Sequence, residues 1–98
     1  MEVTFADEEL ERVATDATFT GGRALALVAA FRRKVQHIVD ADDERDFYQM
    51  KSLHYEKLSG NRGHQHSMRL NDQYRLVVEV LKESSAKRVR IVGIEDYH

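Results

Sequence analysis

The apolar residues of the chain follow two different periods, which divide it into a helical first half and a β-strand second half. The short segment Val3–Phe5 is a strand candidate. Asp7 can then cap a helix, because its carboxylate can accept hydrogen bonds from the backbone N–H groups of the first turn. The apolar residues of this helix recur at helical spacing: Leu10, Val13, Ala14 and Ala17. A second helix is predicted over residues 23–39, with this buried side: Leu27, Val28, Phe31, Val35 and Ile38.

From about residue 64 the apolar residues alternate, which is the period of a half-buried strand. The apolar set is even-numbered: Met68, Leu70, Tyr74, Leu76, Val78 and Val80. If these residues share one face of a hairpin, its loop has an odd number of residues, and Asn71–Gln73 is the simplest choice. That loop pairs Arg69 with Arg75 on the face away from the core. Like charges directly opposite one another are destabilising, so the pair suggests an anionic ligand.

A polar turn over residues 82–87 and a further apolar run over residues 89–92 complete the pattern. The order strand, helix, helix, then antiparallel strands (β-α-α-β-β-β) predicts an α+β fold. In it, the two N-terminal helices pack on one face of a small antiparallel sheet. Because 98 residues fall well below the length at which a core divides, we expect one domain over residues 1–98. The functional site is therefore expected on the other face of the sheet, which the helices leave uncovered.

The amino-acid composition excludes several classes of protein and several kinds of site. Hydrophobic residues make up 42% of the chain, and no run approaches the ~20 apolar residues of a membrane span. The first nine residues contain neither a basic leader nor an apolar stretch, so we expect a cytoplasmic protein without membrane contact. Cysteine is absent, which excludes disulfides, a thiol nucleophile and Cys-based zinc. His64 and His66 lack a third ligand at matching spacing, so we predict neither a metal nor another cofactor.

Charge is distributed unevenly along the chain. The net charge of −2 argues against strong non-specific binding of nucleic acid. Residues 1–50 carry six Lys/Arg and eleven Asp/Glu, a balance of −5, whereas residues 51–98 carry nine and six, a balance of +3. Four of the five histidines also lie in the second half. An anionic ligand is therefore expected there, and the cluster Arg32–Lys34 is interpreted as a solvated helix face.

Residues 58–76, from Leu58-Ser59-Gly60 to Tyr74-Arg75-Leu76, resemble the central signature of the HigB-like toxins. These plasmid-maintenance killer proteins belong to the RelE/ParE superfamily. The segment Glu95-Asp96-Tyr97-His98 is similar to that family's terminus. The resemblance implies a RelE-like fold and an endoribonuclease that enters the ribosomal A site and cuts mRNA by metal-independent attack of a 2′-hydroxyl.

The same resemblance implies the partners of the protein. It predicts a cognate antitoxin with a helix-turn-helix DNA-binding domain, as in HigA-like proteins, and it predicts the ribosome and mRNA as further partners. We expect the chain to be monomeric when free and to form a hetero-oligomer with its antitoxin.

Matched residue by residue, the resemblance places Arg69 and Arg75 where the family has phosphate-binding arginines. The planar guanidinium suits this task because it stays charged and can bind two phosphate oxygens at once. Tyr97 and His98 match the family's terminal pair. His98 is the first candidate for the proton carrier, because imidazole titrates nearest to neutral pH. His54, in the family's Leu-His element, is the second candidate.

Further residues are expected to contact RNA or to orient the site. Asp96 can fix the orientation of His98 or of an arginine. Several relatives carry a lysine directly before the loop glycine, whereas this chain has Ser59. Lys57 and Arg62 are the two options for the replacement cation.

Two alternatives to a ribonuclease remain open. One is a non-enzymatic, ParE-like topoisomerase poison, for which the paired arginines and the terminal Tyr-His would be unnecessary. The other is a decayed toxin that acts only in antitoxin binding and operator autoregulation. The sequence pI of about 6.2 keeps this second alternative open, because the family is usually basic and phosphate contacts strengthen RNA binding through counterion release.

Overall fold

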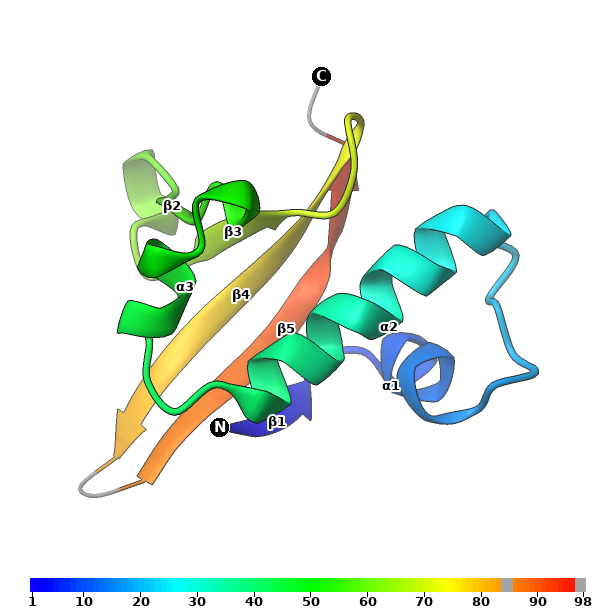
Figure 1. Ribbon diagram of the computed structural model, residues 1–98, viewed down its shortest axis with the longest axis horizontal. Helices are drawn as coiled ribbons and strands as arrows, with labels where there is room; N and C mark the ends of the chain where they lie inside the picture. Colours follow the sequence, from blue (N-terminus) through cyan, green and yellow to red (C-terminus); the bar gives the residue numbers. More distant parts are fainter. Residues whose placement is uncertain (84–85, 97–98) are drawn as a thin grey trace.

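A computed structural model describes residues 1–83 and 86–96 of the chain. Figure 1 shows a twisted sheet with the helices on one of its faces and the chain's first strand beside its last. The helices are α1 (Glu8–Thr15), α2 (Leu25–Asp40) and α3 (Arg45–Gln49), with short 3-10 turns η1 (Lys51–Leu53) and η2 (Gly60–Arg62). The strands are β1 (Glu2–Phe5), β2 (Glu56–Lys57), β3 (His66–Arg69), β4 (Tyr74–Glu83) and β5 (Ala86–Asp96).

The sheet has five strands in the order β1-β5-β4-β3-β2. The predicted α+β class is therefore confirmed, with two corrections. β1 runs parallel to β5, so the sheet is mixed and not purely antiparallel. The short helix α3 and the edge strand β2, which the predicted order lacks, precede the β3–β4 hairpin. A parallel neighbour needs a long crossover connection, and the helices between β1 and the later strands provide it. The segment at residues 3–5 indicates a strand, but its sequence contains no signal for the strand with which it pairs.

The β3–β4 hairpin has the register that the even-numbered apolar residues predict. Arg69 lies opposite Arg75, and Met68 lies opposite Leu76. The loop between them is closed by Asn71, whose side-chain oxygen accepts from the backbone N–H groups of Gln73 at 2.9 Å and Tyr74 at 2.8 Å. An Asx side chain of this kind replaces the hydrogen bonds that a tight turn leaves unmade. The two arginines are thus fixed side by side by the loop.

The first helix begins as predicted and ends earlier. The carboxylate of Asp7 accepts from the backbone N–H of Glu9 at 2.7 Å, which confirms the cap. The helix stops at Thr15, because the Asp16 carboxylate accepts from the backbone N–H and the hydroxyl of Thr18 at 2.9 and 2.7 Å. Such local bonds compete with continuation of the helix. Ala17 consequently lies beyond the helix and is exposed.

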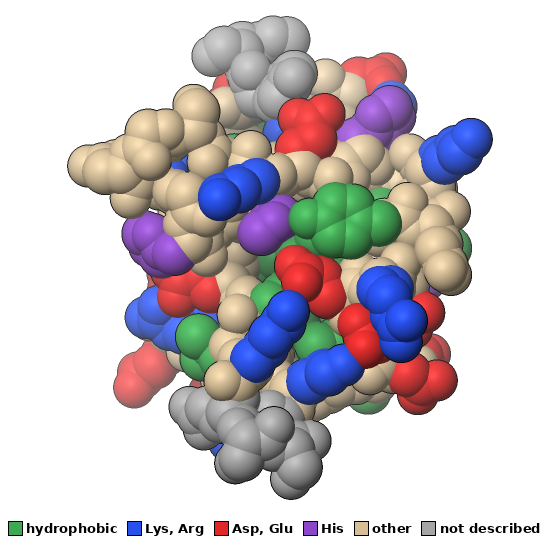
Figure 2. All heavy atoms as spheres, turned by 90° about the vertical axis from the view of Figure 1, so that its left-hand side faces the viewer, with side chains coloured by type: hydrophobic (Ala, Val, Ile, Leu, Met, Phe, Trp, Pro, Cys, Tyr) green, Lys and Arg blue, Asp and Glu red, His purple; other side chains and the backbone are tan. Residues whose placement is uncertain are grey.

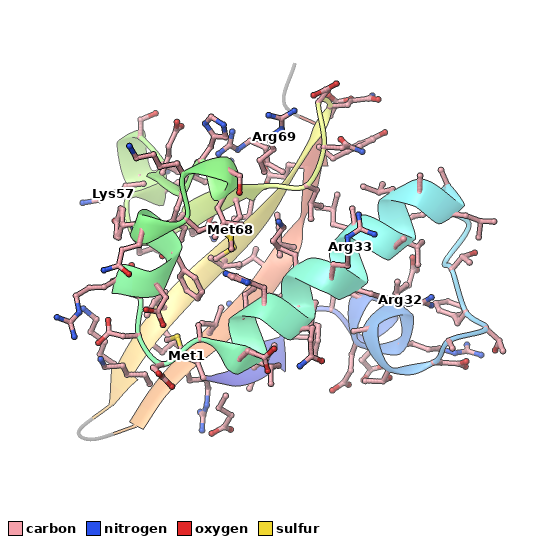
Figure 3. The ribbon with its side chains drawn as sticks, viewed as in Figure 1. Met1, Arg32, Arg33, Lys57, Met68 and Arg69 are labelled. Carbon is pink, nitrogen blue, oxygen red and sulfur yellow. The ribbon has the colours of Figure 1, made fainter. Side chains whose placement is uncertain are left out.

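Arg32 does not lie on a solvated helix face, which corrects the sequence interpretation. Its guanidinium donates to the carbonyls of Val13, Asp16 and Phe19 at 2.9, 3.0 and 3.0 Å. These carbonyls belong to the end of α1 and the segment that follows, where a helix leaves acceptors unsatisfied. Figure 3 shows Arg32 beside α1. The contact therefore fixes α2 against α1, whereas the neighbouring Arg33 is exposed.

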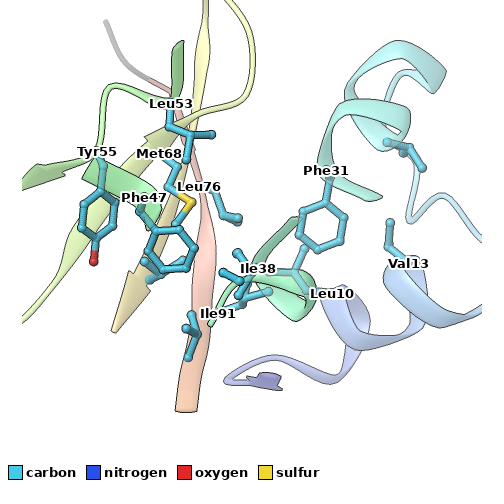
Figure 4. Close-up of a cluster of buried hydrophobic side chains, with 14 residues drawn as sticks. Leu10, Val13, Phe31, Ile38, Phe47, Leu53, Tyr55, Met68, Leu76 and Ile91 are labelled. Carbon is cyan, nitrogen blue, oxygen red and sulfur yellow. The ribbon is translucent and has the colours of Figure 1, made fainter. Parts of the chain in front are cut away.

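The core lies between the helices and one face of the sheet, as Figure 4 shows. Fully buried side chains come from each layer: Leu10, Val13, Phe31, Ile38, Phe47, Leu53, Met68, Leu76 and Ile91. Burial of a side chain of this size contributes about 1.5–3 kcal/mol to folding. Within the described residues, no helix has the length and apolar character needed to cross a membrane. The helix-covered face is thus used for packing, and the opposite face of β3, β4 and β5 carries the candidate site.

Candidate functional site

A hollow of about 350 Å³ opens on the face of the sheet away from the helices, next to the β3–β4 loop. It is lined by His54, Glu56, Arg69, Asn71, Asp72 and Arg75, and we call it the arginine pocket. The predicted pairing of Arg69 with Arg75 brings their side chains to this one pocket. Figure 3 shows Arg69 near the loop, at the opposite end of the sheet from Met1.

The guanidinium of Arg75 is held in place by the protein. Its Nε atom donates to the hydroxyl of Ser67 at 2.9 Å, and a terminal nitrogen donates to the backbone carbonyl of His54. Ser67 is 3% exposed, so this support is buried. Arg75 therefore presents a positioned cation to the pocket, and preorganised charges of this kind stabilise developing negative charge without a cost of reorganisation.

His54 has an unusual backbone conformation. Its φ of 47° places it in the left-handed region, and it is the one non-glycine residue with positive φ in the described part of the chain. Such a conformation costs about 1–3 kcal/mol and persists only where surrounding contacts enforce it. Here it allows the His54 carbonyl to bond Arg75 while the same residue lines the pocket. One strained residue thus fixes the cation and contributes an imidazole.

Arg69 is held more loosely than Arg75. Its guanidinium pairs with the carboxylate of Asp72 in the β3–β4 loop. The Arg69 side chain is 43% exposed and that of Asp72 is 95% exposed. An ion pair this open to solvent contributes little to stability, typically ~0–1 kcal/mol. Arg69 can therefore exchange its carboxylate partner for a phosphate at low cost.

The order of the strands brings the end of β5 to the same site. Glu95 lies opposite Arg75, and Asp96 lies opposite Tyr74. Asp96 accepts from the side-chain amide of Gln73 at 3.1 Å. A second hollow of about 140 Å³ adjoins the arginine pocket, with Glu56, Arg75 and Asp96 among its lining residues. Tyr97 and His98, which follow Asp96 in the sequence, lie outside the described residues.

Neither of the two expected replacement cations lines the arginine pocket. In β2, Glu56 pairs with Ser67 and lines that pocket, so the alternation of the strand places Lys57, opposite His66, on the helix-covered side. Arg62 instead makes a bidentate ion pair with the carboxylate of Glu95, at 3.1 and 2.6 Å. This contact raises the pKa of Arg62 and ties η2 to β5.

Sequence reasoning missed Glu56 and Ser67. Glu56 contributes a carboxylate to both hollows, and Ser67 supports Arg75. Strand β2 has only two residues, too few for a detectable alternation, so no pattern assigned Glu56 to a face. For Ser67, the odd-numbered positions of the predicted hairpin were a usable signal. Among the described residues, no group of three His, Cys, Asp or Glu is arranged to hold a metal ion.

Comparisons with known proteins support the architecture. No family model matches the sequence, and no curated protein matches it. A solved structure described as a YoeB/ParE toxin from Agrobacterium tumefaciens is similar over 100% of both chains, with a TM-score of 0.57 and 16% sequence identity. At this identity the likeness concerns the fold. The chain therefore has a RelE/ParE-like α+β fold, with two main N-terminal helices on a five-stranded mixed sheet.

Proposed function

We propose that this chain is the toxin of a toxin–antitoxin pair, of the HigB-like branch, and that it cleaves mRNA in the ribosomal A site. One observation carries the proposal. Two arginines lie directly opposite each other on β3 and β4 and line a single pocket together with an imidazole and two carboxylates. Cations beside proton-transfer groups are what cleavage of a phosphodiester requires.

In the proposed reaction, the 2′-oxygen beside the scissile bond attacks the phosphorus, and the 5′-oxygen leaves. Arg75 and Arg69 bind the non-bridging oxygens, whose negative charge increases in the transition state. Glu56 or His54 accepts the proton of the 2′-hydroxyl, since both line the pocket. His98 supplies a proton to the leaving oxygen, Tyr97 stacks on the nucleotide and Asp96 orients these groups; these three roles come from the sequence resemblance.

The charge balance supports the proposed dependence on the ribosome. Asp72 pairs with Arg69 and Glu95 pairs with Arg62, so carboxylates of the protein already offset cations in and near the pocket. The net charge is −2. Affinity for free RNA depends strongly on unmatched positive charge, and it is therefore expected to be low. Positioning of the substrate by the ribosome replaces this missing affinity.

Primer extension on mRNA tests the proposal, with the purified chain added to a translating extract or to the same mRNA without ribosomes. Cleavage is expected only during translation and is expected to be lost with Arg75→Ala. Efficient, specific cleavage of the naked mRNA would contradict dependence on the ribosome. The absence of cleavage in both reactions would contradict the ribonuclease. Co-purification with a helix-turn-helix antitoxin from a cytoplasmic extract tests the proposed partner.

A second candidate is a non-enzymatic topoisomerase poison, as in the ParE branch. The same internal ion pairs favour it, because cations already paired with Asp72 and Glu95 are less available to RNA. This candidate predicts that the chain traps a topoisomerase on cleaved DNA in a supercoiling assay and that Arg75→Ala leaves the trapping unchanged. A chain that binds its antitoxin and operator but acts in neither assay would be a decayed toxin.

A further inference from the structure

A second pocket lies across β2 and β3 from the arginine pocket, on the helix-covered side of the sheet. Its volume is about 310 Å³, and its lining includes Glu44, Tyr48, Lys57, His64, His66 and Lys82; we call it the aromatic pocket. Figure 2 shows this side of the molecule, where a hydrophobic side chain and a histidine lie together among basic and acidic groups. None of its lining residues takes part in the proposed cleavage.

Tyr48 is an exposed ring that the protein holds in a fixed position. The residue is 56% exposed. Its hydroxyl lies 3.2 Å from Nε2 of His66, and its ring meets the ring of Tyr55 edge-on at 4.8 Å and 82°. His66 is fixed in turn, because it stacks on Tyr55 at 4.6 Å with an interplanar angle of 8°. A ring held by a T-shaped ring contact and at its hydroxyl offers its exposed surface to a planar ligand, with little conformational entropy left to lose.

The aromatic pocket also carries cations at its rim. The Lys57 side chain lies along Gly63, where a Cβ atom would be 3.3 Å from Cε of the lysine. The ammonium of Lys82 lies 3.6 Å from Glu44, and its side chain is 67% exposed. Glu44 also accepts a hydrogen bond from the Tyr55 hydroxyl at 2.8 Å, so its negative charge is already partly offset by donors of the protein. The rim thus offers ammonium groups to an anion beside the ring of Tyr48.

We propose that the aromatic pocket binds one nucleotide of single-stranded RNA, with the base stacked on Tyr48 and a phosphate bound by Lys57 and Lys82. A planar base with an attached phosphate is the ligand that combines both requirements. The pocket binds this nucleotide whether or not the chain cleaves RNA. That the nucleotide belongs to the mRNA under cleavage rests on the proposed function.

The position of β2 connects the two pockets. β2 is an edge strand, and its two residues face opposite sides: Glu56 lines the arginine pocket and Lys57 lines the aromatic pocket. A single strand of RNA that leaves the arginine pocket can pass over this edge to reach Tyr48. The aromatic pocket therefore holds a nucleotide that flanks the cleavage site and helps to set the register of the substrate.

Fluorescence anisotropy at low ionic strength tests this proposal with a fluorescein-labelled single-stranded RNA of about ten nucleotides, a length within the usual site sizes. Tyr48→Ala is expected to weaken binding by roughly 5- to 100-fold, as for removal of one base-stacking ring. Tyr48→Phe keeps the ring and is expected to keep most of the affinity. Lys82→Ala is expected to weaken binding and to reduce its salt dependence. Lys51→Ala is the matched control, because Lys51 is an exposed cation of η1 that does not line the pocket.

Equal affinities of the wild type and Tyr48→Ala for this RNA would overturn the proposal, as would a wild type that does not bind it. Loss of antitoxin binding with unchanged RNA binding in Tyr48→Ala would assign the pocket to a protein partner instead. The proposed function can fail separately. If the wild type binds RNA through Tyr48 but cleaves nothing on ribosomes, the aromatic pocket is supported and the ribonuclease is wrong. Far-UV circular dichroism of each variant confirms that it is folded.

Discussion

The arginine pocket and the aromatic pocket lie on opposite sides of the same two strands, yet they are built in different ways. The arginine pair of the arginine pocket depends on a local feature, the three-residue loop that places Arg69 opposite Arg75. The aromatic pocket depends on a distant one, because Tyr48 of the short helix α3 meets His66 of β3. A hairpin register can be predicted from a period of two, whereas a cluster assembled between separate segments leaves no periodic signal in the sequence.

The largest expected effect concerns the proposed proton carrier of the cleavage reaction. If His98 supplies the proton to the leaving oxygen, His98→Gln is expected to reduce single-turnover cleavage on programmed ribosomes by about 10²- to 10⁴-fold. Glutamine keeps a hydrogen-bonding side chain but cannot carry a proton at neutral pH. Near-normal cleavage by His98→Gln would show that His98 is not the proton carrier and would leave His54 and Glu56 as candidates. The same assay on His54→Gln and Glu56→Gln would distinguish these two.

A core substitution is expected to affect the aromatic pocket more than the arginine pocket. Phe47 is fully buried and contacts the Tyr55 ring at 5.3 Å, so it supports the rings beneath Tyr48. Phe47→Ala is expected to lower the free energy of unfolding by about 3–5 kcal/mol, measured by urea denaturation. At temperatures where the variant remains folded, RNA binding through Tyr48 should weaken while the Arg69–Arg75 register persists in NMR cross-strand contacts. Unchanged stability would show that the cluster is not a support.

Arg75→Ala is expected to reduce cleavage strongly while the protein remains folded. Loss of a preorganised charge should reduce cleavage by about 10²- to 10³-fold. Loss of its hydrogen bonds to Ser67 and to the His54 carbonyl should lower stability by only about 1–3 kcal/mol.

Ser67→Ala is the matched control for Arg75→Ala, because it removes one of the same hydrogen bonds and keeps the charge. It should retain most of the activity. Equal losses of activity in both variants would mean that Arg75 acts through structure and not through its charge.

The smallest expected effect is a pH dependence specific to the aromatic pocket. Burial lowers the pKa of His66 from its ordinary 6.5, Glu44 opposes this shift, and Lys57 adds to it. The pKa of His66 is lower in the folded state than in the unfolded state. As the pH falls through 6.5, the unfolded state therefore binds more protons than the folded state. Stability is therefore lost below that pH.

Urea denaturation of the wild type and of His66→Phe, which keeps a ring to stack on Tyr55, measures this dependence. The wild type should lose more stability than the variant between about pH 7 and pH 5.5. Parallel pH profiles would contradict the assignment to His66.

Much of the fold could be predicted from sequence because the signals were local. The cap at Asp7, the alternation over 68–80 and the odd loop each involve residues close together in the chain. The parallel pairing of β1 with β5 and the contacts of Arg32 with α1 could not be predicted, since each depends on where distant segments meet. Tyr48 shows the same limit: no local pattern distinguishes it from the buried Phe47 beside it, yet Tyr48 is 56% exposed.

The pairing of the first strand with the last bears on how the protein is made. Glu2 lies opposite Arg88, so this contact joins residues separated by almost the whole chain. Closing so long a loop is entropically costly, and folds rich in such contacts form slowly. During synthesis, β5 leaves the ribosome after the other four strands. Until then, neither β1 nor the Arg75 position of β4 can pair with it. The complete sheet therefore cannot form until the segment of β5 has been synthesised and has left the ribosome.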